Sequence, residues 1–130
     1  MSETRPSCVL LADRHHGLTE GVRGLLETTF GTVVMVADEE SLLEGAERIR
    51  PDVAIVDISL ARDSGLGWLR ALRQRCPEVK VIVLSVHDEQ SVRRAAMDAG
   101  ADSFVLKRAI ATDLLDAVEY VRGGGSGKPR

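Results

Sequence analysis

The sequence predicts an α/β fold in which five parallel strands form one sheet with helices on both faces. Five short apolar runs recur along the chain. They are nearly continuous rather than alternating, as is typical of strands covered on both sides. Segments with apolar residues at helical spacing separate these runs, so strand and helix alternate five times.

The order of the elements follows from this pattern. The expected strands are 8–12, 32–37, 53–57, 79–85 and 103–107. Each is followed by an amphipathic helix whose apolar face lies within 18–26, 42–49, 66–76, 92–99 or 114–121, and Gly100 ends the fourth helix. Asp38 is suited to cap the second helix. For a right-handed, doubly wound (βα)5 sheet of this size we expect the flavodoxin-like strand order 2-1-3-4-5.

The size and composition suit one globular domain. The chain has 130 residues, of which 44% are hydrophobic and 28% charged, and its net charge is −3. This balance, together with few aromatic side chains, gives no general case for nucleic acid or membrane binding. The polar start carries no signal-peptide pattern, and no apolar run approaches the ~20 residues that span a bilayer. We therefore expect a cytoplasmic protein.

The chain divides into a domain and two polar ends. We expect a disordered N-terminus over 1–7, one domain over 8–122 and a flexible, glycine-rich tail or linker over 123–130. Cys8 and Cys76 are far apart in sequence and adjoin apolar segments, so both are expected to be free thiols.

Polar side chains follow or end four of the expected strands. These are Asp13 with Arg14, then Asp57, Ser85 and Lys107. The predicted order makes these four strands neighbours. Ligands of such sheets bind beyond the carboxyl ends of the strands, near the switch point between the first and the third. We therefore expect two carboxylates, a hydroxyl and an ammonium to share one shallow pocket.

Four segments carry a family resemblance in the right order and spacing. They are "LLADRHHGLTEGVRGLLE", "PDVAIVDISL", "VIVLSVHDE" and "GADSFVLKRAIATDLLDAVEYVRGG". With them, residues 8–124 resemble the receiver domain of a bacterial two-component response regulator. The style is that of the subfamily usually joined to a C-terminal LuxR-type helix-turn-helix.

The resemblance implies a phosphorylation site with a metal. Asp57 would be the phospho-acceptor, Asp13 would belong to the acidic pair that holds Mg²⁺, and the backbone carbonyl of Ser59 would be a further metal ligand. A carboxylate is a weak nucleophile and the incoming phosphoryl group is also negative, so a divalent cation that bridges them cancels repulsion and aligns the attack. Mg²⁺ commonly uses one or two carboxylates with substrate oxygens and waters.

The resemblance also assigns the groups that respond to phosphorylation. Lys107 would pair with the phosphoryl oxygens and Ser85 would be the switch hydroxyl that shifts toward them. Phe104 would be the switch aromatic that turns inward to fill the vacated space. The face made by the fourth helix, fifth strand and fifth helix would then change shape.

Arg14 departs from the family pattern, which has a second metal-binding acid at this position. Three acids and one lysine give the usual pocket a net charge of −2. Here Asp13 and Asp57 are balanced by Arg14 and Lys107, so the sum is 0. Two alternatives follow: Arg14 points into solvent and leaves a weak Mg²⁺ site, or its guanidinium pairs with Asp57 where the cation would be.

The resemblance implies a sensor histidine kinase as the partner, a homodimer through the fourth helix, fifth strand and fifth helix, and no nucleic acid contact by this chain itself. The chain would be a switch rather than an enzyme, with self-phosphorylation and autodephosphorylation as its only chemistry. The main alternative is a phosphorylation-independent interaction or dimerisation module in which Arg14 replaces the metal-binding acid. A weaker alternative is a small hydrolase or flavin-type protein on the same fold, but the GxSxG and phosphate-loop motifs are absent.

Overall fold

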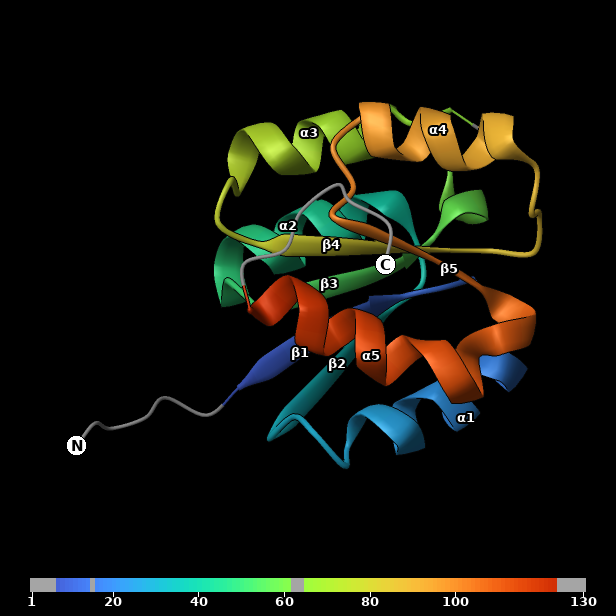
Figure 1. Cartoon of the computed structure of the whole chain (residues 1–130). Coiled ribbons are helices and arrows are strands. Elements are labelled where there is room, and N and C mark those ends of the chain that lie inside the picture. The colour runs from blue at the N-terminus through green and yellow to red at the C-terminus, as the bar shows by residue number, and fades with distance from the viewer. Residues whose placement is uncertain (1–6, 15, 62–64, 124–130) are drawn as a thin grey trace.

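The computed structural model describes residues 7–14, 16–61 and 65–123, without the side chains of residues 16–19. Five parallel strands form one sheet in the order β2-β1-β3-β4-β5, as the sequence predicts (Figure 1). The strands are β1 Cys8–Ala12, β2 Thr32–Val36, β3 Val53–Asp57, β4 Lys80–Ser85 and β5 Ser103–Leu106. The predictions for residues 1–6 and 124–130 lie outside the described residues.

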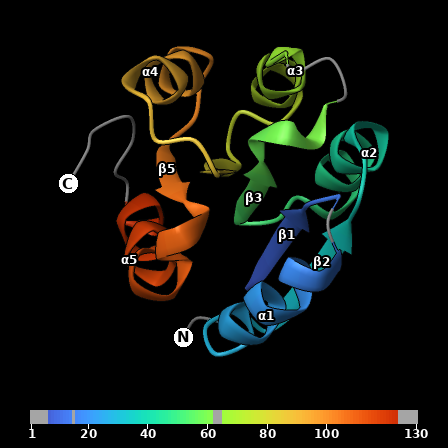
Figure 2. The ribbon, with the colours of Figure 1, turned by 90° about the vertical axis from the view of Figure 1, so that its right-hand side faces the viewer.

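Five helices cover the sheet in two layers. They are α1 His16–Leu26, α2 Glu39–Ile49, α3 Gly67–Arg75, α4 Gln90–Asp98 and α5 Ile110–Arg122. Figure 2 shows α2, α3 and α4 on one face of the sheet and α1 with α5 on the other. The core divides in the same way, into one apolar cluster around Leu10, Leu42 and Trp68 and another around Leu11, Ile55 and Leu114.

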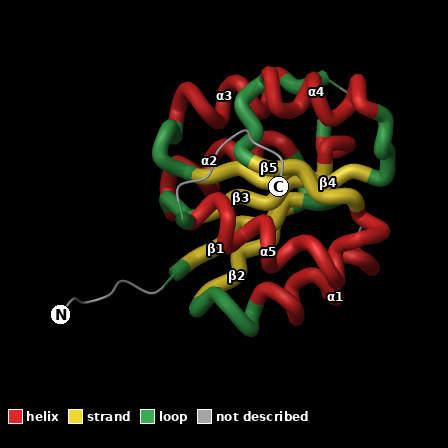
Figure 3. Tube along the Cα trace, in the orientation of Figure 1, coloured by secondary structure: helices red, strands yellow, loops and turns green. Residues whose placement is uncertain are grey.

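The strand boundaries differ from the sequence prediction by single residues (Figure 3). Val79 lies just before β4 but is buried, which explains why an apolar pattern includes it. Lys107 begins a short 3-10 turn, Lys107–Ala109, immediately after β5. All five residues of β3 are buried, because helices cover both faces of this central strand.

Two local predictions from the sequence are confirmed. The Asp38 carboxylate accepts a hydrogen bond from the backbone N–H of Ser41 at 2.7 Å and so caps α2. Cys8 and Cys76 are free thiols, and burial raises the pKa of each. Over the described residues, no helix has the length and apolar character that crossing a membrane requires.

A buried ion pair joins α3 to the segment between α4 and β5. Arg73 donates through Nη1 to the Val79 carbonyl at 2.5 Å and to Asp102 Oδ2 at 3.2 Å. Asp102 is 1% exposed and also accepts from the backbone N–H of Val81 at 2.9 Å. Gly100, with a φ of +119°, packs against the Arg73 stem. One arginine therefore fixes the approach to two neighbouring strands.

Candidate functional site

The predicted site residues lie at the carboxyl-terminal edge of the sheet. Asp13 directly follows β1, and its backbone N–H donates to the Val36 carbonyl at 3.1 Å. Asp57 and Ser85 are the last residues of β3 and β4, and Lys107 is the first residue after β5. Because these strands are parallel neighbours, their ends share one edge.

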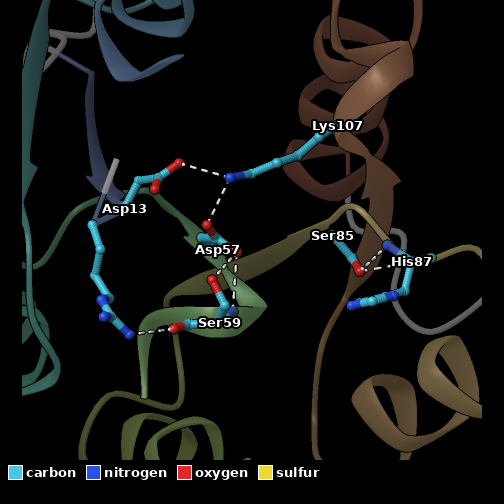
Figure 4. A network of polar contacts seen from close by, with 7 residues as sticks. Asp13, Asp57, Ser59, Ser85, His87 and Lys107 are labelled. Carbon is cyan, nitrogen blue, oxygen red and sulfur yellow. Dashed lines mark hydrogen bonds and ion pairs between the residues drawn. The ribbon is translucent and has the colours of Figure 1, made fainter. Parts of the chain in front are cut away.

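Lys107 joins the two carboxylates (Figure 4). Its Nζ lies 2.6 Å from Asp57 Oδ2 and 3.2 Å from Asp13 Oδ2. Both acids are 3% exposed and the lysine side chain is 10% exposed, so the three charges are largely shielded from water. The sequence prediction that Asp13, Asp57 and Lys107 converge is confirmed by these contacts.

Ser59 fixes the other oxygen of the Asp57 carboxylate. Its backbone N–H and its hydroxyl each donate to Asp57 Oδ1 at 3.0 Å. The geometry arises because a 3-10 turn, Ile58–Leu60, starts directly after β3 with Asp57 as its N-cap. The two oxygens of Asp57 thus face different partners, Ser59 on one side and Lys107 on the other.

These contacts change the acidity of the pair. Burial by itself would raise the pKa of Asp57, but the hydrogen bond and charge of Lys107 and the hydrogen bonds from Ser59 outweigh it and lower that pKa. Burial likewise opposes the charged form of Lys107, yet Asp57 and Asp13 together raise the lysine pKa. Both groups therefore remain charged at neutral pH.

The two expected switch residues are placed differently. The Ser85 hydroxyl is held by the turn after β4: it accepts from the backbone N–H of His87 at 2.9 Å and donates to the His87 carbonyl at 3.2 Å (Figure 4). We expected Phe104 to turn inward only after phosphorylation, but its ring is already buried. The guanidinium carbon of Arg93 on α4 lies 4.8 Å from the centre of that ring.

Comparison with known proteins identifies the family. The family model for the response regulator receiver domain matches residues 9–119. The chain is a response regulator receiver domain. This membership disfavours both the phosphorylation-independent alternative and the hydrolase or flavin-type alternative.

Relatives of this receiver domain include transcriptional regulators. It is 37% identical over 120 residues to the transcriptional regulatory protein DegU of Brevibacillus brevis, covering 91% of this chain and 51% of DegU. It is 36% identical over 129 residues to the nitrate/nitrite response regulator protein NarP of Escherichia coli, covering 98% of this chain and 59% of NarP. The receiver domain thus spans little more than half the length of these relatives.

Solved structures share the fold. A LuxR-family response regulator from Aurantimonas has a TM-score of 0.85 at 25% identity, with 94% of this chain and 89% of that chain covered. The receiver domain of the response regulator NarL from Mycobacterium tuberculosis has a TM-score of 0.80 at 29% identity, with 93% and 99% covered. The isolated receiver domain of RcsB from Salmonella enterica, solved with the phosphomimetic BeF3⁻, has a TM-score of 0.82 at 25% identity, with 97% and 95% covered.

The receiver domain offers oxygen donors of the kind that Mg²⁺ prefers. They are the carboxylates of Asp13 and Asp57, held together by Lys107, and the carbonyl of Ser59. No cluster of three or more His, Cys, Asp or Glu suited to a metal occurs among the described residues. The donor set therefore fits Mg²⁺ in chemistry, with two acids and one carbonyl from the protein.

Arg14 takes a position that neither sequence alternative describes in full. Its side chain is exposed, as the first alternative holds, but Nη1 donates to the Ser59 carbonyl at 3.3 Å. The guanidinium is thus attached to the residue that also binds Asp57. It contacts the carbonyl that the sequence analysis assigns to the metal.

Some contacts of the site were not predicted from the sequence. Arg108 pairs with Asp88 at 2.9 Å and so links the loops after β5 and β4, and the Arg108 charge lowers the Asp88 pKa. His87 matters through its backbone, which no side-chain pattern reveals. Arg93 lies over Phe104 because α4 packs beside β5, a relation visible only in three dimensions.

Proposed function

We propose that this receiver domain, residues 8–122, is a switch in which Asp57 accepts a phosphoryl group from a sensor histidine kinase in the cytoplasm. The observation that carries the proposal is the contact of the Lys107 ammonium with both Asp57 and Asp13 at the carboxyl edge of the sheet. A carboxylate kept ionised beside a fixed cation suits attack on a negatively charged phosphoryl group.

The transfer uses only groups of this site. An Asp57 oxygen attacks phosphorus, the new O–P bond forms as the bond to the donor breaks, and the donor leaves with the electron pair. Lys107 attracts the phosphoryl oxygens while Ser59 holds the second carboxylate oxygen in place. Mg²⁺ held by Asp13, Asp57 and the Ser59 carbonyl would cancel part of the repulsion between the reactants. The chain modifies itself and turns over no other substrate.

The response starts at Ser85. The phosphoryl group adds about −1.5 to −2 charge at Asp57 and attracts the Ser85 hydroxyl, which must then leave His87. The turn after β4 rearranges with it, and the face made by α4, β5 and α5 changes. We propose that a second copy of the chain binds this face. Transcription regulation, the activity named for several relatives, would be exerted by a DNA-binding domain following in the native protein.

Incubation with acetyl phosphate and Mg²⁺ tests the proposal by intact mass. We expect one added phosphoryl group on the wild-type chain and none on Asp57→Asn. Asp88→Asn is the matched control, because Asp88 is an exposed acid near the same edge and should leave the adduct in place. An adduct that survives Asp57→Asn, or its absence from the wild type with and without Mg²⁺, would refute the assignment.

A further inference from the structure

Arg14 is coupled to the phospho-acceptor through one residue. Its Nη1 donates to the Ser59 carbonyl at 3.3 Å, and Ser59 donates twice to Asp57 Oδ1, at 3.0 Å each. On the opposite oxygen, Asp57 Oδ2 receives the Lys107 ammonium at 2.6 Å. The acceptor carboxylate is therefore flanked by two cations of the protein, one in direct contact and one across Ser59.

The second cation opposes a metal ion in two ways. It engages the Ser59 carbonyl, which is one of the three proposed protein ligands of Mg²⁺, and it adds a positive charge beside a divalent ion. Asp13 and Asp57 contribute −2 and Lys107 with Arg14 contribute +2, so the protein groups sum to 0. A site without net negative charge holds Mg²⁺ weakly, because the carboxylates are already compensated.

The same guanidinium suits the phosphoryl group. A guanidinium carries five N–H donors in one plane and binds oxyanions through two of them at once, whereas an ammonium acts as a point charge. Arg14 is exposed at the rim, so it can reach an incoming group without displacing core residues. Its charge does not depend on the concentration of a dissolved ion.

We propose that Arg14 supplies part of the positive charge that a divalent cation would otherwise bring, so that this domain binds Mg²⁺ weakly and accepts a phosphoryl group with little dependence on it. The proposal rests on the proposed function of Asp57. It concerns the residue that follows Asp13 and the carbonyl of Ser59, and it assigns Arg14 a contact with the phosphoryl oxygens.

Calorimetric titration with MgCl₂ measures the first half without any phosphodonor. Removing one exposed charge next to a divalent ion is worth about tenfold in affinity at water-like screening. We expect Arg14→Gln to bind Mg²⁺ about tenfold more tightly than the wild type and Arg14→Asp about a hundredfold more tightly. Arg108→Gln is the matched control: it removes an exposed arginine that pairs with Asp88 and not with Ser59, and it should change the affinity less than about threefold.

Phosphorylation by acetyl phosphate in excess EDTA measures the second half by intact mass. The wild type should still form the adduct, Arg14→Gln should form it about tenfold more slowly, and Arg14→Asp should require Mg²⁺. Thermal unfolding monitors the fold of each variant, since an exposed side chain should leave it intact.

The two measurements also separate failure of this proposal from failure of the proposed function. Equal Mg²⁺ affinity in wild type and both Arg14 variants would overturn the inference, and so would a wild-type adduct that disappears in EDTA. A wild type that takes no phosphoryl group with or without Mg²⁺ would overturn the function of Asp57, while the titration would still decide whether Arg14 controls the metal.

Discussion

Lys107→Ala should lower the free energy of unfolding by about 3 kcal/mol at pH 7, measured by urea denaturation in EDTA. The substitution leaves Asp13 and Asp57, both 3% exposed, without the ammonium that contacts each of them. Two neighbouring carboxylates cannot both remain ionised in such surroundings at low cost. Lys80→Ala is the control, because that lysine lies at the opposite end of β4 and should change stability by less than about 1 kcal/mol.

The loss should shrink as the pH falls. In the wild type the Asp57 pKa is lowered, so its stabilising effect is present above the ordinary carboxyl pKa and disappears only when the pH falls through the lowered value. In Lys107→Ala, burial and the neighbouring acid raise the pKa of one carboxyl above its unfolded value, so proton uptake favours the folded state. We expect a smaller difference between variant and wild type at pH 5 than at pH 7. A difference that is constant or grows would contradict the charge explanation.

Gly100→Ala should destabilise the fold by a similar amount, about 3 kcal/mol, measured by thermal or urea unfolding. Gly100 ends α4 in a Schellman motif: its N–H donates to the Met97 carbonyl and the Ala101 N–H donates to the Ala96 carbonyl, both at 3.1 Å. A side chain at a φ of +119° is strained, and its Cβ would lie 2.7 Å from Arg73 Cγ. Arg73 cannot move aside freely because its guanidinium holds Val79 and Asp102.

Gly21→Ala is the matched comparison for this prediction. Gly21 is an exposed residue within α1, and a Cβ there would meet nothing within 4 Å. Alanine has the higher helix propensity, so this variant should gain about 0.5–1 kcal/mol. If both glycine variants changed stability in the same direction, the close approach of Arg73 would not be the cause.

The sequence predicted the fold well because each layer has its own pattern. Continuous apolar runs such as Val53–Asp57 indicate strands covered on both faces, and Gly100 after a helical stripe indicates where that helix ends. The boundary errors fall on Val79 and Lys107, where burial and charge continue past the last paired residue. Burial is what the pattern records, and backbone pairing is only correlated with it.

The sequence predicted the site only as far as strand order carries it. Strand order alone brings Asp13, Asp57 and Lys107 to one edge, so their contact was predictable. The direction of a side chain was not: Arg14 could face water or Asp57 from its place in the chain, and it bonds to the Ser59 carbonyl instead. The early burial of Phe104 was also missed, because it depends on how α4 packs beside β5.

The tie between Ser85 and His87 sets how readily the turn after β4 can open. One hydroxyl holds this turn through a 2.9 Å bond, and His87 is exposed, so water can replace the hydroxyl as acceptor for the His87 N–H. Such an exchange costs only about 1 kcal/mol net, which corresponds to an open fraction of roughly one molecule in six. The resting population therefore already contains molecules with the turn released. A new negative charge nearby has only to draw the Ser85 hydroxyl toward itself to make them the majority.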